Sequence, residues 1–281
     1  MQLSLKIIGV QTLVSSLTYT TTRDIKRSYK SNMRIIDDHI HCGNNKRTKI
    51  FTLDDIRQDL NEAGAQGAVI FAFPEDIYRI ESTPESRIKY NEYALEISKT
   101  DKLDLYPFYF VWNDFILPDN LSDYAGIKWH RHWDEPKYDY DDPACKKILK
   151  AIKGLNLPVV LEEEYEYTVR FVKENPELNV IIPHIGFLNG GYDKMPVFFD
   201  NPRVFFDTGT APLNEIKKVL HNVGVERVIF GSDVSGTSVP FFNYTKVELD
   251  KVLQLNLDEK SMSMIFSENI ERLIPKKFIK K

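Results

Sequence analysis

From residue 34 onward, the hydrophobic and polar positions of the chain follow two alternating patterns. Short continuous runs rich in Val, Ile and Phe have the length of buried strands. Between them, apolar residues recur every three or four positions, as on one face of a helix. Strands that are apolar along their whole length are typical of a parallel sheet covered on both faces. The runs predict eight strands, at residues 34–38, 68–74, 105–112, 125–130, 158–162, 180–184, 204–207 and 228–233.

The segments between these strands predict helices, at residues 53–66, 88–98, 144–154, 167–174, 213–223, 244–254 and 258–273. Pro196 interrupts residues 193–200, which therefore predict only a turn. Eight strands that alternate with helices favour an α/β fold of the (β/α)8 or TIM-barrel type over an open doubly wound sheet. No Gly-x-Gly-x-x-Gly loop follows the first strand, which weakens a dinucleotide-binding alternative.

Residues 1–32 predict an N-terminal extension outside the fold. Met33 stands immediately before the first strand-like run, and no linker interrupts the pattern after it. We therefore expect residues 33–281 to form one domain, and a chain that begins at Met33 to fold and to be active.

Composition and charge exclude several classes of function. The 281 residues are 42% hydrophobic and 28% charged, which suffices for a sizeable core. The net charge of −4 and the lack of a long basic block argue against a nucleic-acid-binding protein. No run reaches the roughly 18 apolar residues of a membrane-spanning helix. Two cysteines give no disulfide framework, which fits a cytoplasmic protein.

Reactive side chains gather where the predicted strands end. In a barrel of this type, the carboxyl ends of the strands form one rim, where active sites lie. Four of the six histidines are at strand ends, which scattered surface histidines would not explain. The reactive strand-end residues are His39, His41, Lys128, His130, Glu162, His184, Asp207 and Asp233.

His39 and His41 are two positions apart, so on an extended strand both side chains share one face. Two imidazoles this close suit a divalent metal, which binds one nitrogen of each ring and leaves the other for an outer acceptor. Alternatively, one histidine caps a turn and the other is a hydrogen-bonded core residue. The pair alone does not decide between these interpretations.

A set of ordered motifs adds to this pattern. The segments IIDDHIHCG, GIKWH, LPVVLEEE, NVIIPHIGFLNGG, RVIFGSD and SENIERLI follow one another along the chain. In this order they resemble the amidohydrolase-related family of metal-dependent TIM-barrel hydrolases, over roughly residues 33–275. The resemblance implies that His39, His41 and Asp233 bind a divalent metal, zinc or alternatively manganese. It also implies that His184 is a ligand or lies beside the reacting centre.

Lys128 and His130 are implied as substrate-binding residues. A lysine at the end of the fourth strand is carbamylated in some relatives and faces the substrate in others, and we favour the second role here. His130 either orients a substrate or caps the loop that follows. The aromatic residues near the rim either hold a planar substrate or pack in the core: Trp112, Trp129, Trp133 and Phe187.

One position departs from the family pattern. Relatives usually end the fifth strand in a histidine ligand, and this chain has Glu162 there. A carboxylate can bind zinc or manganese at a similar distance, so Glu162 is a candidate ligand that shifts metal preference. Alternatively, Glu162 does not bind and the site is weakened. Glu163 and Glu164 follow directly, which permits a shift of one residue, and at least one of the three is expected in an exposed loop.

The resemblance implies metal-dependent hydrolysis of an amide, lactone or ester bond in a small molecule. In that reaction Asp233 would accept the proton of the attacking water, and His184 would stabilise charge on the carbonyl oxygen. Decarboxylation of an aromatic or unsaturated acid is the alternative, since relatives do this with a similar site. A barrel that has lost catalysis and only binds a ligand is a second alternative. Family members are often homodimers, so a homodimer is also expected.

Overall fold

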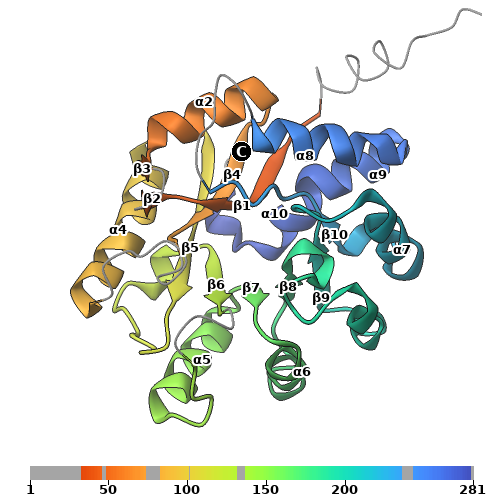
Figure 1. Ribbon diagram of the computed structural model, residues 1–281. Coiled ribbons are helices and arrows are strands. Elements are labelled where there is room, and N and C mark those ends of the chain that lie inside the picture. Colours follow the sequence, from red (N-terminus) through yellow and green to blue (C-terminus); the bar gives the residue numbers. More distant parts are fainter. Residues whose placement is uncertain are drawn as a thin grey trace, which may run out of the picture. The chain divides into compact units, whose positions relative to one another are not determined.

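The computed structural model describes residues 33–45, 49–73, 83–100, 102–131, 137–235 and 243–279. Eight parallel strands lie side by side in chain order, with helices in a ring outside them (Figure 1). The predicted (β/α)8 barrel is therefore confirmed. The strands are β1 (Ile36–His41), β4 (Gly67–Phe71), β5 (Asp104–Val111), β6 (Gly126–His130), β7 (Val159–Glu162), β8 (Val180–Ile182), β9 (Val204–Asp207) and β10 (Val228–Ile229).

The sheet closes where β1 meets the segment that follows β10. Asp38 N donates to the carbonyl of Phe230 at 3.0 Å, and His41 N donates to that of Val234 at 3.0 Å. Ile40 also forms a parallel bridge with Val234. These bonds bring the first and last strands together, so the carboxyl ends of all eight strands surround one mouth.

The helices follow the predicted order. They are α2 (Leu53–Ala63), α4 (Pro84–Thr100), α5 (Pro143–Leu155), α6 (Tyr165–Glu174), α7 (Leu213–Val223), α8 (Tyr244–Val252), α9 (Glu259–Ser263) and α10 (Asn269–Leu273). A π-helical segment, η6 (Met264–Glu268), joins α9 to α10, so the predicted helix over 258–273 is made of three pieces. Where a turn was expected after the sixth strand, a short 3₁₀ helix forms, η3 (Tyr192–Phe198), with Pro196 inside it.

Three strands end at least two residues earlier than their sequence patterns predict. β4 ends at Phe71. β8 ends at Ile182, and β10 covers only Val228–Ile229. After β8 the backbone turns left-handed at His184 (φ 56°) and Ile185 (φ 53°), which ends the extended conformation. The sequence patterns also missed an antiparallel hairpin between β1 and α2, formed by β2 (Gly43–Asn45) and β3 (Lys49–Phe51).

Apolar side chains from several strands pack together in the core, including Ile36, Val69, Phe108 and Ile229. Polar side chains replace them toward the carboxyl ends, where His39, Lys128, Glu162 and Asp207 are buried. The apolar core holds the strands at fixed spacing, so the polar end presents its groups on a rigid frame.

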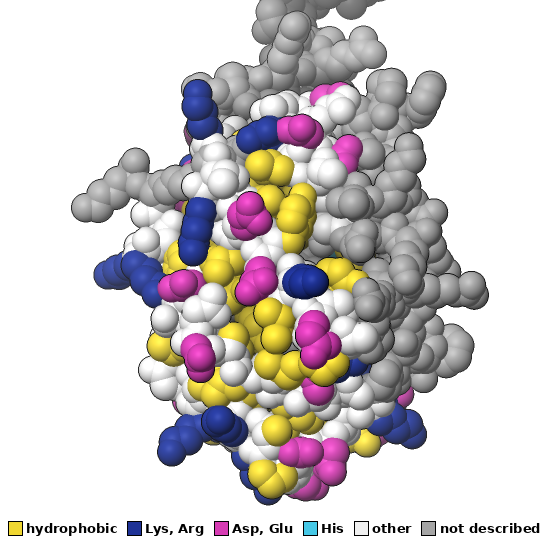
Figure 2. Space-filling view, turned by 90° about the vertical axis from the view of Figure 1, so that its left-hand side faces the viewer, with side chains coloured by type: hydrophobic (Ala, Val, Ile, Leu, Met, Phe, Trp, Pro, Cys, Tyr) yellow, Lys and Arg dark blue, Asp and Glu magenta, His cyan; other side chains and the backbone are white. Residues whose placement is uncertain are grey.

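The outer surface mixes charge and apolar groups. On the side of the molecule that carries α4, β2 and β3, acidic and basic side chains are interspersed with hydrophobic ones (Figure 2). None of the helices in the described ranges is both long enough and apolar enough to cross a membrane. Residues 1–32 lie outside the described residues, so the proposal that they are a dispensable extension stays a prediction.

Candidate metal and active site

The pairing of β1 with β4 contains a bulge, in which β1 has one extra residue between Asp37 and Ile40. Asp37 pairs with Ala68 and Ile40 pairs with Ile70, so three steps along β1 match two along β4. An extra residue of this kind re-aims the side chains around it. His39 forms a hydrogen bond with Asp207. The preceding residue, Asp38, is also fully buried and lies close to the Asp207 carboxylate.

Three histidines from two strand ends have their Nδ1 atoms occupied by oxygen acceptors. His39 Nδ1 lies 2.8 Å from Asp207 Oδ2, His41 Nδ1 2.8 Å from the Ala72 carbonyl, and His184 Nδ1 2.9 Å from the Gly209 carbonyl. Each contact assigns the hydrogen to Nδ1, because the partner is an acceptor. The Nε2 atoms are thereby directed away from these acceptors and toward the site, as in histidines that bind metals.

Asp233 stands where these Nε2 atoms converge. Its Oδ1 lies 3.4 Å from His39 Nε2 and 3.6 Å from His41 Nε2. His39, His184 and Asp233 each offer a ligand atom, and all three atoms lie within 4.8 Å of one another. Imidazole nitrogens with a carboxylate oxygen are a donor set that zinc and manganese accept. The residues therefore fit a divalent metal ion.

Glu162 lies beside this cluster and is paired with a lysine. Lys128 Nζ is 2.7 Å from Glu162 Oε2 and 3.2 Å from His39 Nε2. His130 Nε2 approaches Glu162 Oε1 at 3.3 Å, and His184 Nε2 approaches Glu162 Oε2 at 3.7 Å. The ion pair with Lys128 weighs against a ligand role for Glu162, which stays a prediction.

Burial and neighbouring charges set the protonation of the histidines. Burial, followed by the nearby Lys128, lowers the pKa of His39 and holds that of His41 well below its usual range. Burial also opposes charge on His184, but the carboxylates of Asp233 and Glu162 raise its pKa to about 10. His39 and His41 are thus neutral at pH 7, which is the form that binds a metal.

His184 sits in a strained turn. His184 and Ile185 both have positive φ, and Ile185 is β-branched, a type that rarely adopts this conformation. Such strain costs on the order of 1–3 kcal/mol and persists only where the surroundings fix it. Gly186 follows with φ 86°, and a Cβ there would come within 2.0 Å of Met195 Sδ, so only glycine fits. The turn brings His184 back to the barrel mouth.

A second buried network lies behind β7. Arg131 Nη1 is 3.1 Å from Glu163 Oε1, and the Tyr140 hydroxyl donates to Glu163 Oε2. Trp129 Nε1 donates to the Tyr140 hydroxyl at 3.1 Å, so Trp129 belongs to this network and packs in the core. Arg131 Nη2 also reaches Glu164 Oε2 at 3.1 Å, and the Glu164 side chain is 45% exposed. Two of the three consecutive glutamates are therefore buried, and Glu164 is half-buried at the start of α6.

The other rim aromatics do not gather around the cluster. Trp112 is buried in the barrel core, whereas Phe187 is 56% exposed. Trp133 lies outside the described residues. The described aromatic residues give no support to a sandwich of aromatic rings around a substrate.

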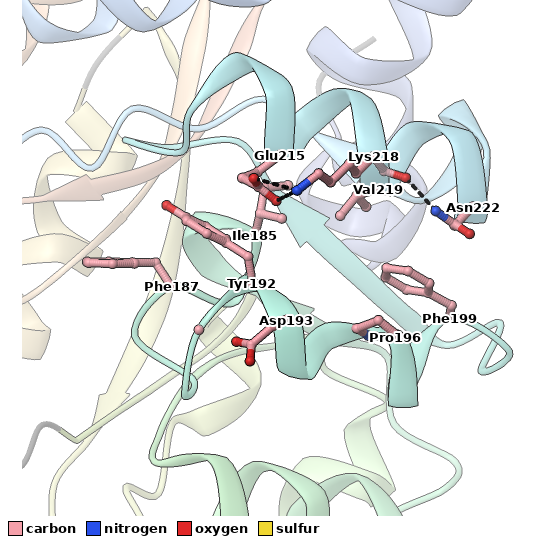
Figure 3. Close-up of a pocket in the computed structure, with 11 residues that line it drawn as sticks. Ile185, Phe187, Tyr192, Asp193, Pro196, Phe199, Glu215, Lys218, Val219 and Asn222 are labelled. Atoms are coloured by element: carbon pink, nitrogen blue, oxygen red, sulfur yellow. Dashed lines mark hydrogen bonds and ion pairs between the residues drawn. The ribbon is translucent and has the colours of Figure 1, made fainter.

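A groove of about 560 Å³ lies between η3 and α7. Figure 3 shows Phe187 and Tyr192 at one end of it and Phe199 at the other, with Lys218 paired to Glu215 above. Among the described residues that line this groove there is no histidine. The buried histidines and the carboxylates that pair with them lie at the barrel mouth instead, which makes the mouth the candidate active site.

The structure brings the five candidate ligands named from the sequence to one rim, where their role as ligands stays a prediction, and the sequence reasoning missed groups that contact them. Asp207 was noted only as a strand end, although it bonds His39 directly. Asp38 was not singled out, although neither of its buried carboxylate oxygens has a hydrogen-bond partner among the described residues. The strand-end position of Asp207 was the available signal, and nothing in the pattern indicated Asp38.

Comparisons with known proteins agree with this fold. Among solved structures, a probable 2-pyrone-4,6-dicarboxylic acid hydrolase from Acinetobacter baumannii is 17% identical, with a TM-score of 0.65 over 86% of this chain and 99% of that one. 5-Carboxyvanillate decarboxylase from Sphingomonas paucimobilis is 11% identical, with a TM-score of 0.64 over 86% and 98%. 2,6-Dihydroxybenzoate decarboxylase from Rhizobium is 13% identical, with a TM-score of 0.62 over 86% and 98%.

At sequence identities this low, the similarity to these structures shows a shared fold and nothing more. No curated protein matches the sequence. The sequence model of the family described as amidohydrolase matches residues 123–276, more than half of the chain, which confirms the resemblance drawn from the motifs. The chain belongs to the amidohydrolase family.

Proposed function

We propose that the protein is a metal-dependent hydrolase that cleaves an amide, lactone or ester bond in a small molecule. One observation carries the proposal: Asp233 Oδ1 lies 3.4 Å and 3.6 Å from the Nε2 atoms of His39 and His41, while its side chain is 30% exposed. A carboxylate in this position reaches both the metal ligands and solvent water. It is therefore suited to accept a proton from that water.

His39, His41 and Asp233 would hold the divalent ion, zinc or alternatively manganese, and His184 lies within ligand distance of His39 and Asp233. When bound, the ion acidifies water and polarises a substrate carbonyl. Asp207 keeps the His39 ring oriented through the bond to Nδ1, so the ligand nitrogen is fixed before substrate arrives.

Asp233 accepts the proton of the attacking water and returns it to the leaving group. His184 donates from Nε2 to the carbonyl oxygen as negative charge develops there. This role suits the geometry, because Nδ1 already donates to the Gly209 carbonyl and Nε2 faces the Glu162 carboxylate, which favours a proton there.

The experiment is a screen of the metal-loaded protein against lactones, esters and amides, with products identified by mass. Hydrolysis adds one water to the substrate. Release of CO₂ from aromatic acids, without hydrolysis of any member of the screen, would favour decarboxylation instead. The structural neighbours include decarboxylases by name, so aromatic acids belong in the screen.

The alternative of a catalytically inactive barrel is disfavoured by the site itself. A protein that only binds a ligand has no need to bring His39, His41, His184 and Asp233 together on one rim. We also infer a cytoplasmic location, since both cysteines are buried and unpaired. We also infer a homodimer, because members of the family are often dimers. Light scattering would measure the mass of the protein in solution and test this.

A further inference from the structure

The turn that follows β9 supplies the oxygens that contact Nδ1 of His184. The Gly209 carbonyl oxygen lies 2.9 Å from His184 Nδ1, and Thr210 Oγ1 lies 3.3 Å from the same atom. The single Nδ1 hydrogen is thus shared between oxygens of two adjacent residues, as in a three-centre hydrogen bond. The orientation of the His184 ring therefore depends on the backbone conformation at Gly209 and Thr210.

Thr210 has a backbone conformation that a threonine rarely adopts. Its φ of 54° lies in the left-handed region, where a side chain branched at Cβ is strained. Strain of this kind persists only where neighbouring groups fix the backbone. A group that holds Thr210 in this conformation therefore also fixes the two oxygens that contact His184.

Glu248 on α8 is placed to hold Thr210. Its Oε2 accepts the Thr210 backbone N–H at 2.9 Å, and the residue is only 7% exposed. Lys251, three residues further along the same helix, pairs with Glu248 and donates to the Thr208 carbonyl at 3.3 Å. α8 thus binds the turn on both sides of Gly209, through one backbone N–H and one backbone carbonyl. A carboxylate that accepts a backbone N–H forms one of the stronger hydrogen bonds in proteins.

We propose that Glu248 is a positioning residue for His184. It keeps Thr210 left-handed, and the turn then fixes the imidazole through Nδ1, so that Nε2 is directed into the barrel mouth. The inference rests on the hydrolase function proposed above, in which His184 Nε2 donates to the substrate oxygen. It adds the group on α8 that fixes this donor before a substrate arrives, which is what a preorganised site requires.

Exchange of the imidazole Nδ1 hydrogens with solvent tests this proposal, because a held hydrogen exchanges only when its bond opens. NMR of the full-length protein with ¹⁵N-labelled histidine and added zinc measures the exchange, and His184→Gln identifies the His184 signal. We expect Glu248→Ala to speed exchange at His184 by about tenfold. Glu248→Gln keeps an oxygen that accepts the Thr210 N–H and should exchange like the wild type.

His41 provides the internal reference, since its Nδ1 contacts the Ala72 carbonyl and not the turn after β9. If Glu248 only stabilised the fold, Glu248→Ala would speed exchange at His41 and His184 by the same factor, and this result would overturn the proposal. Exchange at His184 that is unchanged in Glu248→Ala would overturn it too. Glu259→Ala is the matched control: it removes an exposed glutamate from α9 and should leave both signals as in the wild type.

A second pair of variants keeps the test available if Glu248→Ala does not fold. Glycine adopts the left-handed conformation without strain, so Thr210→Gly should make Glu248 dispensable. Glu248→Ala combined with Thr210→Gly should fold and exchange at His184 at the rate of Thr210→Gly alone. A double variant that does not fold, or that exchanges faster, would overturn the proposal. These measurements need no turnover, so their failure is distinct from failure of the hydrolase screen.

Discussion

Asp207 Oδ2 accepts a hydrogen bond from His39 Nδ1 at 2.8 Å, and both side chains are fully buried. Burial opposes charge on Asp207, but the bond from His39 lowers its pKa, so the carboxylate is ionised at pH 7. A buried carboxylate in this position fixes both the tautomer and the orientation of the imidazole. The Nε2 atom of His39 is therefore already directed at Asp233 before a metal binds.

Asp207→Asn should weaken metal binding by about tenfold, since an amide oxygen holds the imidazole less firmly than a carboxylate. Competition against a chromophoric chelator measures the affinity. Asp141→Asn is the control, because Asp141 is an exposed partner of Arg170 far along the chain from the ligands. If Asp207→Asn binds metal as tightly as the control, Asp207 does not orient His39 for metal binding.

His184→Gln separates the two roles that this histidine can have. If His184 donates to the substrate oxygen, the variant keeps its metal and loses turnover by roughly 10²-fold. Metal analysis and kinetics on a substrate from the screen measure the two effects separately. Loss of the metal from this variant would show that His184 is a ligand and would contradict the role proposed here.

Gly126→Ala should destabilise the barrel. A Cβ at position 126 would lie 2.4 Å from the Phe108 ring, so the core must shift, at a cost of about 1–3 kcal/mol. Gly154→Ala provides a matched control in α5, where nothing lies within 4 Å and alanine should stabilise the helix by about 0.5–1 kcal/mol. Urea unfolding of both variants gives the comparison, and equal midpoints would contradict the packing argument.

Asp59 gives the protein a pH-dependent stability. It is 1% exposed on α2, and burial raises the pKa of Asp59 to about 6, against a hydrogen bond from the Thr245 hydroxyl that lowers it. The folded state thus holds this proton more tightly than the unfolded chain, whose carboxyl titrates near 3.9. Ionisation therefore destabilises the fold, with a cost that grows between about pH 4 and pH 6 and is constant above.

Asp59→Asn should remove this cost, which is on the order of 2–3 kcal/mol at pH 7. Its free energy of unfolding should fall less than that of the wild type as the pH rises from 4 to 6. Asp54→Asn on the same helix is the control, because the Asp54 side chain is 87% exposed. Parallel stability curves for wild type and Asp59→Asn would show that Asp59 is not held protonated.

The candidate ligands could be located from the sequence because each one ends an apolar run. A closed parallel barrel brings all strand ends to one rim, so His39, His184 and Asp233 had to lie near one another once the eight runs were recognised. That inference needs only the order of strands and helices. It requires no knowledge of register.

Details that depend on register were out of reach. The extra residue in β1 leaves no mark in the alternation of the sequence, yet it places Asp38 and His39 together beside Asp207. The sequence alone does not distinguish which of three consecutive glutamates faces the barrel interior. The register of β6 and β7 decides it, because His130 pairs with Glu162 and the Glu162 side chain then contacts Lys128. The left-handed turn at His184 likewise depends on tertiary packing.

Metal analysis of three purified proteins tests the central claim most directly: the wild type, His39→Ala and Glu162→Gln. We expect about one zinc or manganese ion per chain in the wild type, loss of the ion in His39→Ala, and retention in Glu162→Gln. That result would place the metal on the histidine and aspartate cluster, with Glu162 as the partner of Lys128. A wild type that binds no metal after supplementation, or a Glu162→Gln protein that loses it, would contradict the account.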